Sequence, residues 1–347
     1  MAVTAFIDRL ERAAKGPADE ELGLGNSPGS QRVFEATLKP SLSDVHLRDR
    51  EAAVAYLNSI YPALRRHYDW FRRTQRGQIK QYGRKARSRT EAYRWRGRSK
   101  DHVLTSGMDD YPRGAPHAGE LHLDLMAWMA FFSRTMRRIA EFVGEEDDIK
   151  AFIEIEQAVL NNMEDLHWNE EEKLYCDVSV TDDGIVSSCF SSLTKLTPAA
   201  DESVHVCHRG YLSLFPLLLG LLPSSSPHLG PILDLMRDPK HLWSPYGLRS
   251  LSASHPLFGQ GENYWRGPIW VHMNYMALSS LYKVRLTFVS RIEILKTLSQ
   301  IYAAEPGPYQ QQAAEIYTEL RKNVIDNVYK VGASSCTQHL LMVVAGI

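Results

Sequence analysis

Residues 104–113 hold two adjacent carboxylates, a tyrosine and an arginine within one short segment. Gly107 precedes the two acids and Pro112 follows them. Because glycine tolerates positive φ and proline fixes its own φ and restricts the residue before it, the segment predicts a rigid, non-helical turn. Such a turn could aim Asp109 or Asp110 as a catalytic acid. Either aspartate could instead cap the helix that follows, because Asp is favoured at helix starts.

Two further segments combine charged groups with aromatic rings, and they read Tyr-Arg-Trp-Arg-Gly-Arg at 93–98 and Gly-Glu-Asn-Tyr-Trp-Arg-Gly-Pro-Ile-Trp at 261–270. Aromatic faces can hold a sugar ring, and arginines offer forked donors to its hydroxyl groups. With acids added, this is the mixture that glycoside hydrolysis needs. We therefore expect the following residues to bind substrate: Trp95, Arg96, Asp110, Arg113, Glu262, Tyr264, Trp265, Arg266 and Trp270.

An inverting hydrolase also needs a carboxylate base. The two carboxyls of such enzymes lie about 6.5–9.5 Å apart, which neighbouring residues such as Asp109 and Asp110 do not easily provide but two separate loops can. On spacing alone the candidate is Glu262. That residue could instead cap a helix beginning near Pro268 or orient Arg266.

Composition limits the other classes of function. The chain has 347 residues, 44% of them hydrophobic, and a formal net charge of -1, so it has no long-range attraction for nucleic acids or anionic membranes. The longest apolar run, residues 211–222, is too short to span a bilayer, and the N-terminus meets charge too early for a signal peptide. We expect no membrane segment in this chain and a monomer.

The cysteines lack the pairing and spacing of a zinc site, so we expect no metal, while one or two disulfides are possible. The four are Cys176, Cys189, Cys207 and Cys336.

A basic segment gives the main rival hypothesis. Residues 76–100 hold ten Lys or Arg against the single acid Glu91, with Tyr82, Tyr93 and Trp95 interleaved, which is the composition of a nucleic-acid-binding strip. The alternative is a solvated loop that leads into a site. We favour the loop and expect no nucleic-acid partner, because the rest of the chain supplies no further recognition motif.

Apolar residues at helical spacing predict a series of helix pairs with aromatic loops between them. Stacked helical hairpins with function in the loops at one rim favour an all-α fold of the α/α toroid type. We expect residues 1–45 to be irregular. The expected helices cover residues 47–71 with a kink or break at Pro62, 121–144, 147–166, 209–222, 229–237, a segment from 268, and 309–329, with a short extended piece at 167–175.

Five motifs resemble glycoside hydrolase family 63, the family of the processing mannosyl-oligosaccharide glucosidases. They lie at residues 93–98, 106–113, 210–217, 241–250 and 264–270. The resemblance extends over about residues 50–330. It implies an (α/α)6 toroid, or six-hairpin barrel, and inverting removal of the terminal α-1,2-linked glucose from the Glc3Man9GlcNAc2 N-glycan of nascent glycoproteins. It also implies a lumenal, membrane-associated location in the endoplasmic reticulum and no cofactor.

The resemblance assigns the proton donor to Asp109 and places Tyr264, Trp265 and Arg266 along the sugar pocket. The family's base is a Glu in a C-terminal Glu-Gln-Tyr stretch, which has no counterpart after Tyr329. The family's upstream Trp-Asp-Glu-Gly-Phe-His segment, N-terminal β-domain and membrane anchor are not found either. We therefore expect a chain truncated at both ends, with a partial catalytic barrel at 46–330, a divergent tail at 331–347, and weak or no activity. The alternative is a remnant that binds glycan without hydrolysing it.

Overall fold

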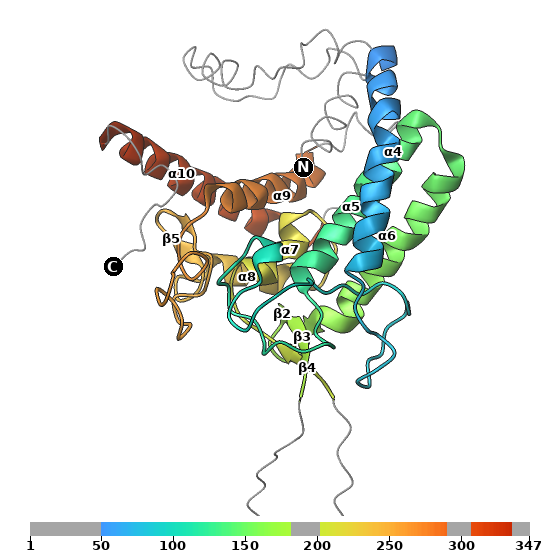
Figure 1. Ribbon diagram of the computed structural model, residues 1–347. Helices are drawn as coiled ribbons and strands as arrows, with labels where there is room; N and C mark the ends of the chain where they lie inside the picture. The colour runs from blue at the N-terminus through green and yellow to red at the C-terminus, as the bar shows by residue number, and fades with distance from the viewer. Residues whose placement is uncertain (1–49, 182–201, 290–306, 335–347) are drawn as a thin grey trace, which may run out of the picture. The chain divides into compact units, whose positions relative to one another are not determined.

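The computed structural model describes residues 50–181, 202–289 and 307–334. These parts of the chain are mostly helical, with three two-stranded antiparallel pairs (Figure 1), which confirms the all-α prediction. The number of helix pairs stays a prediction, as do the domain boundaries. The segment 1–45 and residues 335–347 lie outside the described residues. No helix in the described ranges is both long and apolar enough to cross a membrane.

The chain divides into two compact units, residues 1–73 with 132–156, and residues 74–131 with 157–347. The first unit contains most of α4 (Arg50–Thr74), the C-terminal part of α5 (Leu123–Val143) and the N-terminal part of α6 (Glu146–His167). Helix α4 continues across Pro62, so the chain has no break there. Gly144, in the left-handed region at φ 82°, follows the last residue of α5, and three acids favour the first turn of α6.

Aromatic packing and buried polar contacts hold the first unit together. The Tyr68 ring contacts Phe132 and Phe152 edge to face, each at a centroid distance of 5.1 Å. Its hydroxyl lies 2.8 Å from Ser133 Oγ. Closer to the start of α4, the Tyr61 hydroxyl donates to Asp148 Oδ2 at 2.5 Å. These contacts explain why the apolar stripe within residues 50–71 forms one long helix.

The second unit follows α6 with short strands. The hairpin of β1 (Trp168–Asn169) and β2 (Leu174–Tyr175) confirms the expected extended piece. Strands β3 (Asp177–Val180) and β4 (Ser203–Val206) pair antiparallel, with Asp177 opposite Val206. Beyond this pair a disulfide joins Cys176 to Cys207, while Cys189 and Cys336 lie outside the described residues.

Helices then alternate with loops. Helix α7 is fully buried but shorter than residues 209–222, and α9 begins three residues after Pro268. Helix α8 has the expected bounds, and α9 packs against both α7 and α10. The elements are α7 (Tyr211–Leu218), α8 (Leu229–Arg237), β5 (Trp243–Ser244), β6 (Gly247–Leu248), α9 (Val271–Val289) and α10 (Gln310–Ser334).

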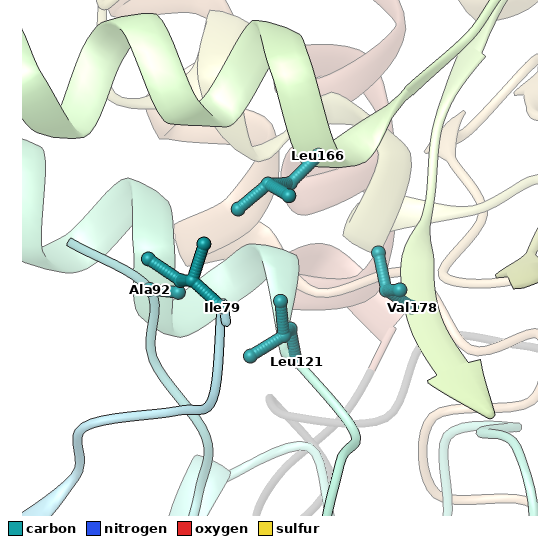
Figure 2. Packing of buried hydrophobic residues seen from close by; sticks show 5 residues of the cluster. All are labelled: Ile79, Ala92, Leu121, Leu166 and Val178. Carbon is teal, nitrogen blue, oxygen red and sulfur yellow. The ribbon is translucent and has the colours of Figure 1, made fainter. Parts of the chain in front are cut away.

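A small apolar cluster fixes the basic segment to the rest of the second unit. Figure 2 shows its five members, Ile79, Ala92, Leu121, Leu166 and Val178, all buried. Leu121 and Val178 exchange two main-chain hydrogen bonds of 2.8 and 3.0 Å. The cluster therefore ties the segment before α5 to β3, and this contact places the strand that carries Asp177.

Candidate active site

The acidic segment forms the rigid turn that its glycine and proline predict. A 3-10 turn at Leu104–Ser106 ends at Gly107, which has φ 70°. The Val103 N–H then donates to the Asp109 carbonyl at 3.0 Å. Helix α5 begins only at Leu123, whose N–H is accepted by Asp177 Oδ1 at 2.8 Å, so the helix-capping alternative for Asp109 and Asp110 is wrong.

The two aspartates of this turn have different surroundings. Asp109 is half-buried, and none of the described residues donates a hydrogen bond to its carboxylate. Asp110 is buried, with 1% of its surface exposed. Its Oδ1 accepts the Trp265 N–H at 2.7 Å and its Oδ2 accepts the Tyr264 N–H at 2.9 Å. The structure thus brings the acidic turn and the loop 261–270 together, as the sequence predicts.

Loop 261–270, here called the aromatic loop, stacks its own rings. The Trp265 and Trp270 rings lie 4.7 Å apart with planes 22° apart. Trp270 Nε1 donates to the Tyr264 carbonyl at 3.0 Å, whereas Trp265 Nε1 is buried without a hydrogen-bond partner among the described residues. The Asn263 side-chain carbonyl is likewise buried without a hydrogen-bond partner among these residues. Buried polar groups nearly always find partners, so these two atoms are the candidates in this loop for a hydrogen bond to a ligand.

Arg113 lies inside the protein between two carboxylates. Its Nη2 is 2.6 Å from Asp124 Oδ2 and its Nη1 is 2.7 Å from Asp177 Oδ2, and its side chain is 2% exposed. Burial alone would lower the pKa of Arg113, but the two carboxylates raise it. Trp95 Nε1 also donates to Asp124, at 3.1 Å. Asp124 therefore holds Arg113 and Trp95 in place.

Sequence reasoning did not identify Asp177 as part of this support. It follows Cys176 directly, and His208 likewise follows Cys207, the other half of the disulfide. The Tyr111 hydroxyl donates to the His208 carbonyl at 3.1 Å. A Cβ at Gly210 would lie 2.1 Å from the Tyr111 hydroxyl, so this contact requires glycine there. The disulfide therefore joins the two segments that support the acidic turn.

Glu262 is an exposed residue of the aromatic loop, with 64% of its side chain accessible, and its Oε1 lies 3.1 Å from His102 Nε2. Arg266 instead donates to the carbonyls of Asp110 and Gln260. Because α9 begins at Val271, Glu262 does not cap it. Both structural alternatives that the sequence left open for Glu262 are therefore wrong.

The basic segment uses many of its charges within the protein. Arg94 and Arg98 both pair with the buried Glu120, at 3.1 and 2.6 Å, and Arg87 pairs with Asp165 at 2.9 Å. Other guanidinium groups bond main-chain carbonyls, with Arg84 Nη2 donating to Gly119 and Arg96 Nη2 donating to Arg76. This arrangement favours a segment that is folded into the site over a nucleic-acid-binding strip.

Comparison with known proteins places this site in a family. The family model described as the glycosyl hydrolase family 63 C-terminal domain matches residues 24–336. The chain is 44% identical over 333 residues to the probable mannosyl-oligosaccharide glucosidase of Schizosaccharomyces pombe, covering 95% of this chain and 36% of that protein. It is 37% identical over 338 residues to the mannosyl-oligosaccharide glucosidase of Saccharomyces cerevisiae, covering 94% of this chain and 36% of that protein. The chain thus spans about a third of the length of these relatives.

Among solved structures, a GH63 mannosylglycerate hydrolase from Thermus thermophilus in complex with glucose is 19% identical, with a TM-score of 0.33, and covers 48% of this chain and 34% of that one. That likeness is too low to carry an argument. The match of the family model over most of the sequence is decisive, and it shows that the chain belongs to glycosyl hydrolase family 63, within the C-terminal domain of that family.

Proposed function

We propose that this chain carries the proton-donor side of an inverting exo-α-glucosidase, which removes the terminal α-1,2-linked glucose from the Glc3Man9GlcNAc2 N-glycan precursor. The names of the fungal relatives support glucosidase chemistry. The observation that carries the proposal is the pair of neighbouring aspartates. Asp110 bonds the aromatic loop, while the carboxylate of Asp109 receives no hydrogen bond from the described residues.

In the proposed reaction Asp109 gives its proton to the glycosidic oxygen as the bond from that oxygen to the anomeric carbon breaks. A carboxylate on the opposite face takes a proton from the attacking water, and the anomeric configuration inverts. Glu262 pairs with His102 at the exposed end of the aromatic loop, and we assign it to the rim of the glycan site. We assign the role of base to none of the described residues, so we expect slow or no turnover.

The groups proposed to contact glucose are those that the protein leaves unpartnered. The indole N–H of Trp265 and the side-chain carbonyl of Asn263 can each bond a hydroxyl group. Tyr264 is 43% exposed and can cover the face of a sugar ring. Trp270 stacks on the Trp265 ring and holds it in place.

The remaining candidates support the site. Trp95 Nε1 donates to Asp124, and Nη2 and Nη1 of Arg113 pair with Asp124 and Asp177, so we propose that these two residues support the site. Arg96 donates to the Arg76 carbonyl, and we propose that it too supports the site.

The disulfide supports the proposed location. Disulfides form and persist in oxidising compartments, which include the lumen of the endoplasmic reticulum. The bond between Cys176 and Cys207 is therefore consistent with a lumenal protein that meets glycans on nascent glycoproteins.

One alternative function has a specific observation behind it. Unpartnered donors and acceptors are present in the aromatic loop, but a carboxylate base is not assigned. A glycan-binding protein of the same family that does not hydrolyse would have this combination.

Calorimetric titration tests the proposal and separates it from the alternative. The ligands are the triglucosylated glycan and the same glycan without its terminal glucose. We expect binding that depends on the terminal glucose, both in the natural chain and in Asp109→Asn. Any release of free glucose should be lost in Asp109→Asn. Equal affinity for the two glycans would contradict the proposal, and slow release of glucose that Asp109→Asn abolishes would favour it over the alternative.

A further inference from the structure

We propose that Asp110 and Arg266 form a positioning pair that sets the aromatic loop against Asp109, and that neither contacts the glycan directly. This inference rests on the proposed function for the meaning of the site. The contacts themselves are independent of it.

Asp110 is bonded to three consecutive residues of the aromatic loop. Its two carboxylate oxygens accept the main-chain N–H groups of Tyr264 and Trp265, and its own carbonyl accepts Arg266 Nε at 2.7 Å. Only 1% of its surface is exposed. Because so little of it is exposed and each oxygen already accepts a main-chain N–H, the carboxylate is shielded from the hydroxyl groups of a ligand. Asp110 is therefore a structural anchor of the loop.

Arg266 completes the contact from the other side. Its guanidinium lies 3.7 Å from Asp110 Oδ2, as measured from Nε, and its Nη1 donates to the Gln260 carbonyl at 3.3 Å. A Cβ at Gly261 would lie 2.5 Å from this Nη1, so the glycine makes room for the guanidinium. Two nitrogens of Arg266, Nε and Nη1, donate to main-chain carbonyls of the turn and of its own loop. Donors used in this way fix the geometry of the loop.

The pair determines where the indole of Trp265 lies. The Trp265 ring continues from the main-chain N–H that Asp110 holds, and it stacks on Trp270, whose Nε1 is bonded to the Tyr264 carbonyl. Asp109 is the residue directly before Asp110 in the chain, so their Cα atoms are about 3.8 Å apart. The proposed proton donor and the unpartnered indole N–H are therefore placed through one residue. Loss of the hydrogen bonds from Asp110 should displace the Trp265 indole relative to Asp109. Catalysis and binding are sensitive to displacements of about 1 Å.

The neighbouring aspartates supply a matched pair of variants. Asp110→Asn keeps one acceptor oxygen and replaces the other with an NH2 group that cannot accept, whereas Asp109→Asn makes the same chemical change at a carboxylate without a described donor. The first measurement is hydrogen exchange of the Tyr264 and Trp265 amides by NMR in the full chain without ligand. We expect at least tenfold faster exchange of one or both amides in Asp110→Asn. We expect less than threefold change in Asp109→Asn.

Arg266→Lys provides a second variant if Asp110→Asn does not fold. Lysine keeps the charge but cannot bond the Asp110 and Gln260 carbonyls with a planar fork. We expect faster exchange of the same two amides, while amides within α7 keep their protection. Unchanged exchange at both amides in a folded Asp110→Asn protein, or in Arg266→Lys if that is the variant that folds, would overturn the positioning pair.

The second measurement distinguishes positioning from a purely structural role. Each variant is titrated with the disaccharide in which one glucose is α-1,2-linked to another. We expect Kd to rise at least tenfold in Asp110→Asn relative to the natural chain. Faster exchange with unchanged Kd would overturn the positioning role. If the natural chain does not bind the disaccharide, the proposed function fails, and the exchange result alone then decides whether the pair holds the loop.

Discussion

The basic segment 76–100 and the aromatic loop 261–270 have similar compositions but different uses of their polar groups. In the basic segment, Trp95 Nε1 donates to Asp124, and Arg94 and Arg98 share Glu120. In the aromatic loop, the Trp265 indole N–H and the Asn263 carbonyl are buried without partners among the described residues. Both segments join arginines to aromatic rings beside glycine, and of the two only the aromatic loop holds buried side-chain atoms without partners among the described residues.

The difference shows that composition identifies a surface that could bind and that geometry decides whether it does. A guanidinium that is already paired with a buried carboxylate would have to break that pair before it could bind a phosphate or a hydroxyl group. A buried indole N–H without a partner gains a hydrogen bond when a ligand arrives. The comparison therefore predicts that changes in the basic segment affect stability, while changes in the aromatic loop affect binding.

The largest effect is expected at Glu120. Its side chain is 4% exposed and pairs with two arginines, so Glu120→Ala should destabilise the fold by about 3–5 kcal/mol by leaving buried charges without a partner. Glu262→Ala removes the exposed partner of His102 and should cost less than about 1 kcal/mol. Urea unfolding of both variants measures the two losses. Equal losses would show that the two segments are held in the same way.

The second-largest effect is expected from lowering the pH, which should destabilise the contacts that hold the basic segment. His122 accepts the Trp95 N–H, and burial, reinforced by Arg113 and Arg98, holds its pKa well below the usual range. Burial also lowers the pKa of His167 to about 4. Between pH 6.5 and 4 these histidines therefore bind protons in the unfolded chain but stay neutral in the folded chain, so the free energy of unfolding decreases as the pH falls.

For His167 the lowering of the pKa to about 4 corresponds to about 3 kcal/mol of the free energy of unfolding. The protein has this stability at neutral pH, loses it as the pH falls below about 6.5, and has lost all of it below about pH 4. The free energy of unfolding should decrease from pH 7 to 5, and His167→Gln should reduce that slope. A free energy of unfolding that stays constant over this range would contradict the assignment of neutral buried histidines.

Two tryptophans provide a closer test of the comparison. Trp265→Phe keeps an aromatic ring but removes the unpartnered N–H, so it should weaken binding of the triglucosylated glycan by about threefold to tenfold, the value of one hydrogen bond. Trp95→Phe removes a donor to the buried Asp124 and should instead cost about 1–3 kcal/mol of stability. Calorimetry and urea unfolding of both proteins separate the two effects. The reverse assignment of effects would exchange the roles of the two segments.

The smallest effect is expected for nucleic acid. Because five of the basic side chains are bonded within the protein, a short single-stranded RNA should bind without the steep salt dependence of phosphate recognition. Titration at two salt concentrations measures this. Affinity that falls by orders of magnitude with added salt would restore the nucleic-acid hypothesis.

Local patterns in the sequence predicted the elements well where the signal is local. The apolar spacing of residues 229–237 gave the bounds of α8, and Gly107 with Pro112 predicted the turn that the structure contains. Helix α9 begins later than Pro268 because the residues after this proline still belong to the loop.

Partnerships between distant residues carry no such signal. Arg113 and Asp177 are 64 positions apart, and His102 and Glu262 are 160 apart. The sequence therefore grouped Asp110, Arg113 and Trp95 with the substrate contacts, because their residue types suit a sugar. Their burial and their bonds to other loops depend on the tertiary fold, which residue type does not reveal.

The most direct test is an NMR titration of the chain with the α-1,2-linked glucose disaccharide. We predict that the Trp265 indole N–H resonance and the amides of residues 263–265 shift on binding, and that the amides of residues 76–100 stay in place. Shifts confined to the basic segment, with the Trp265 indole unmoved, would contradict the assignment of the glycan site.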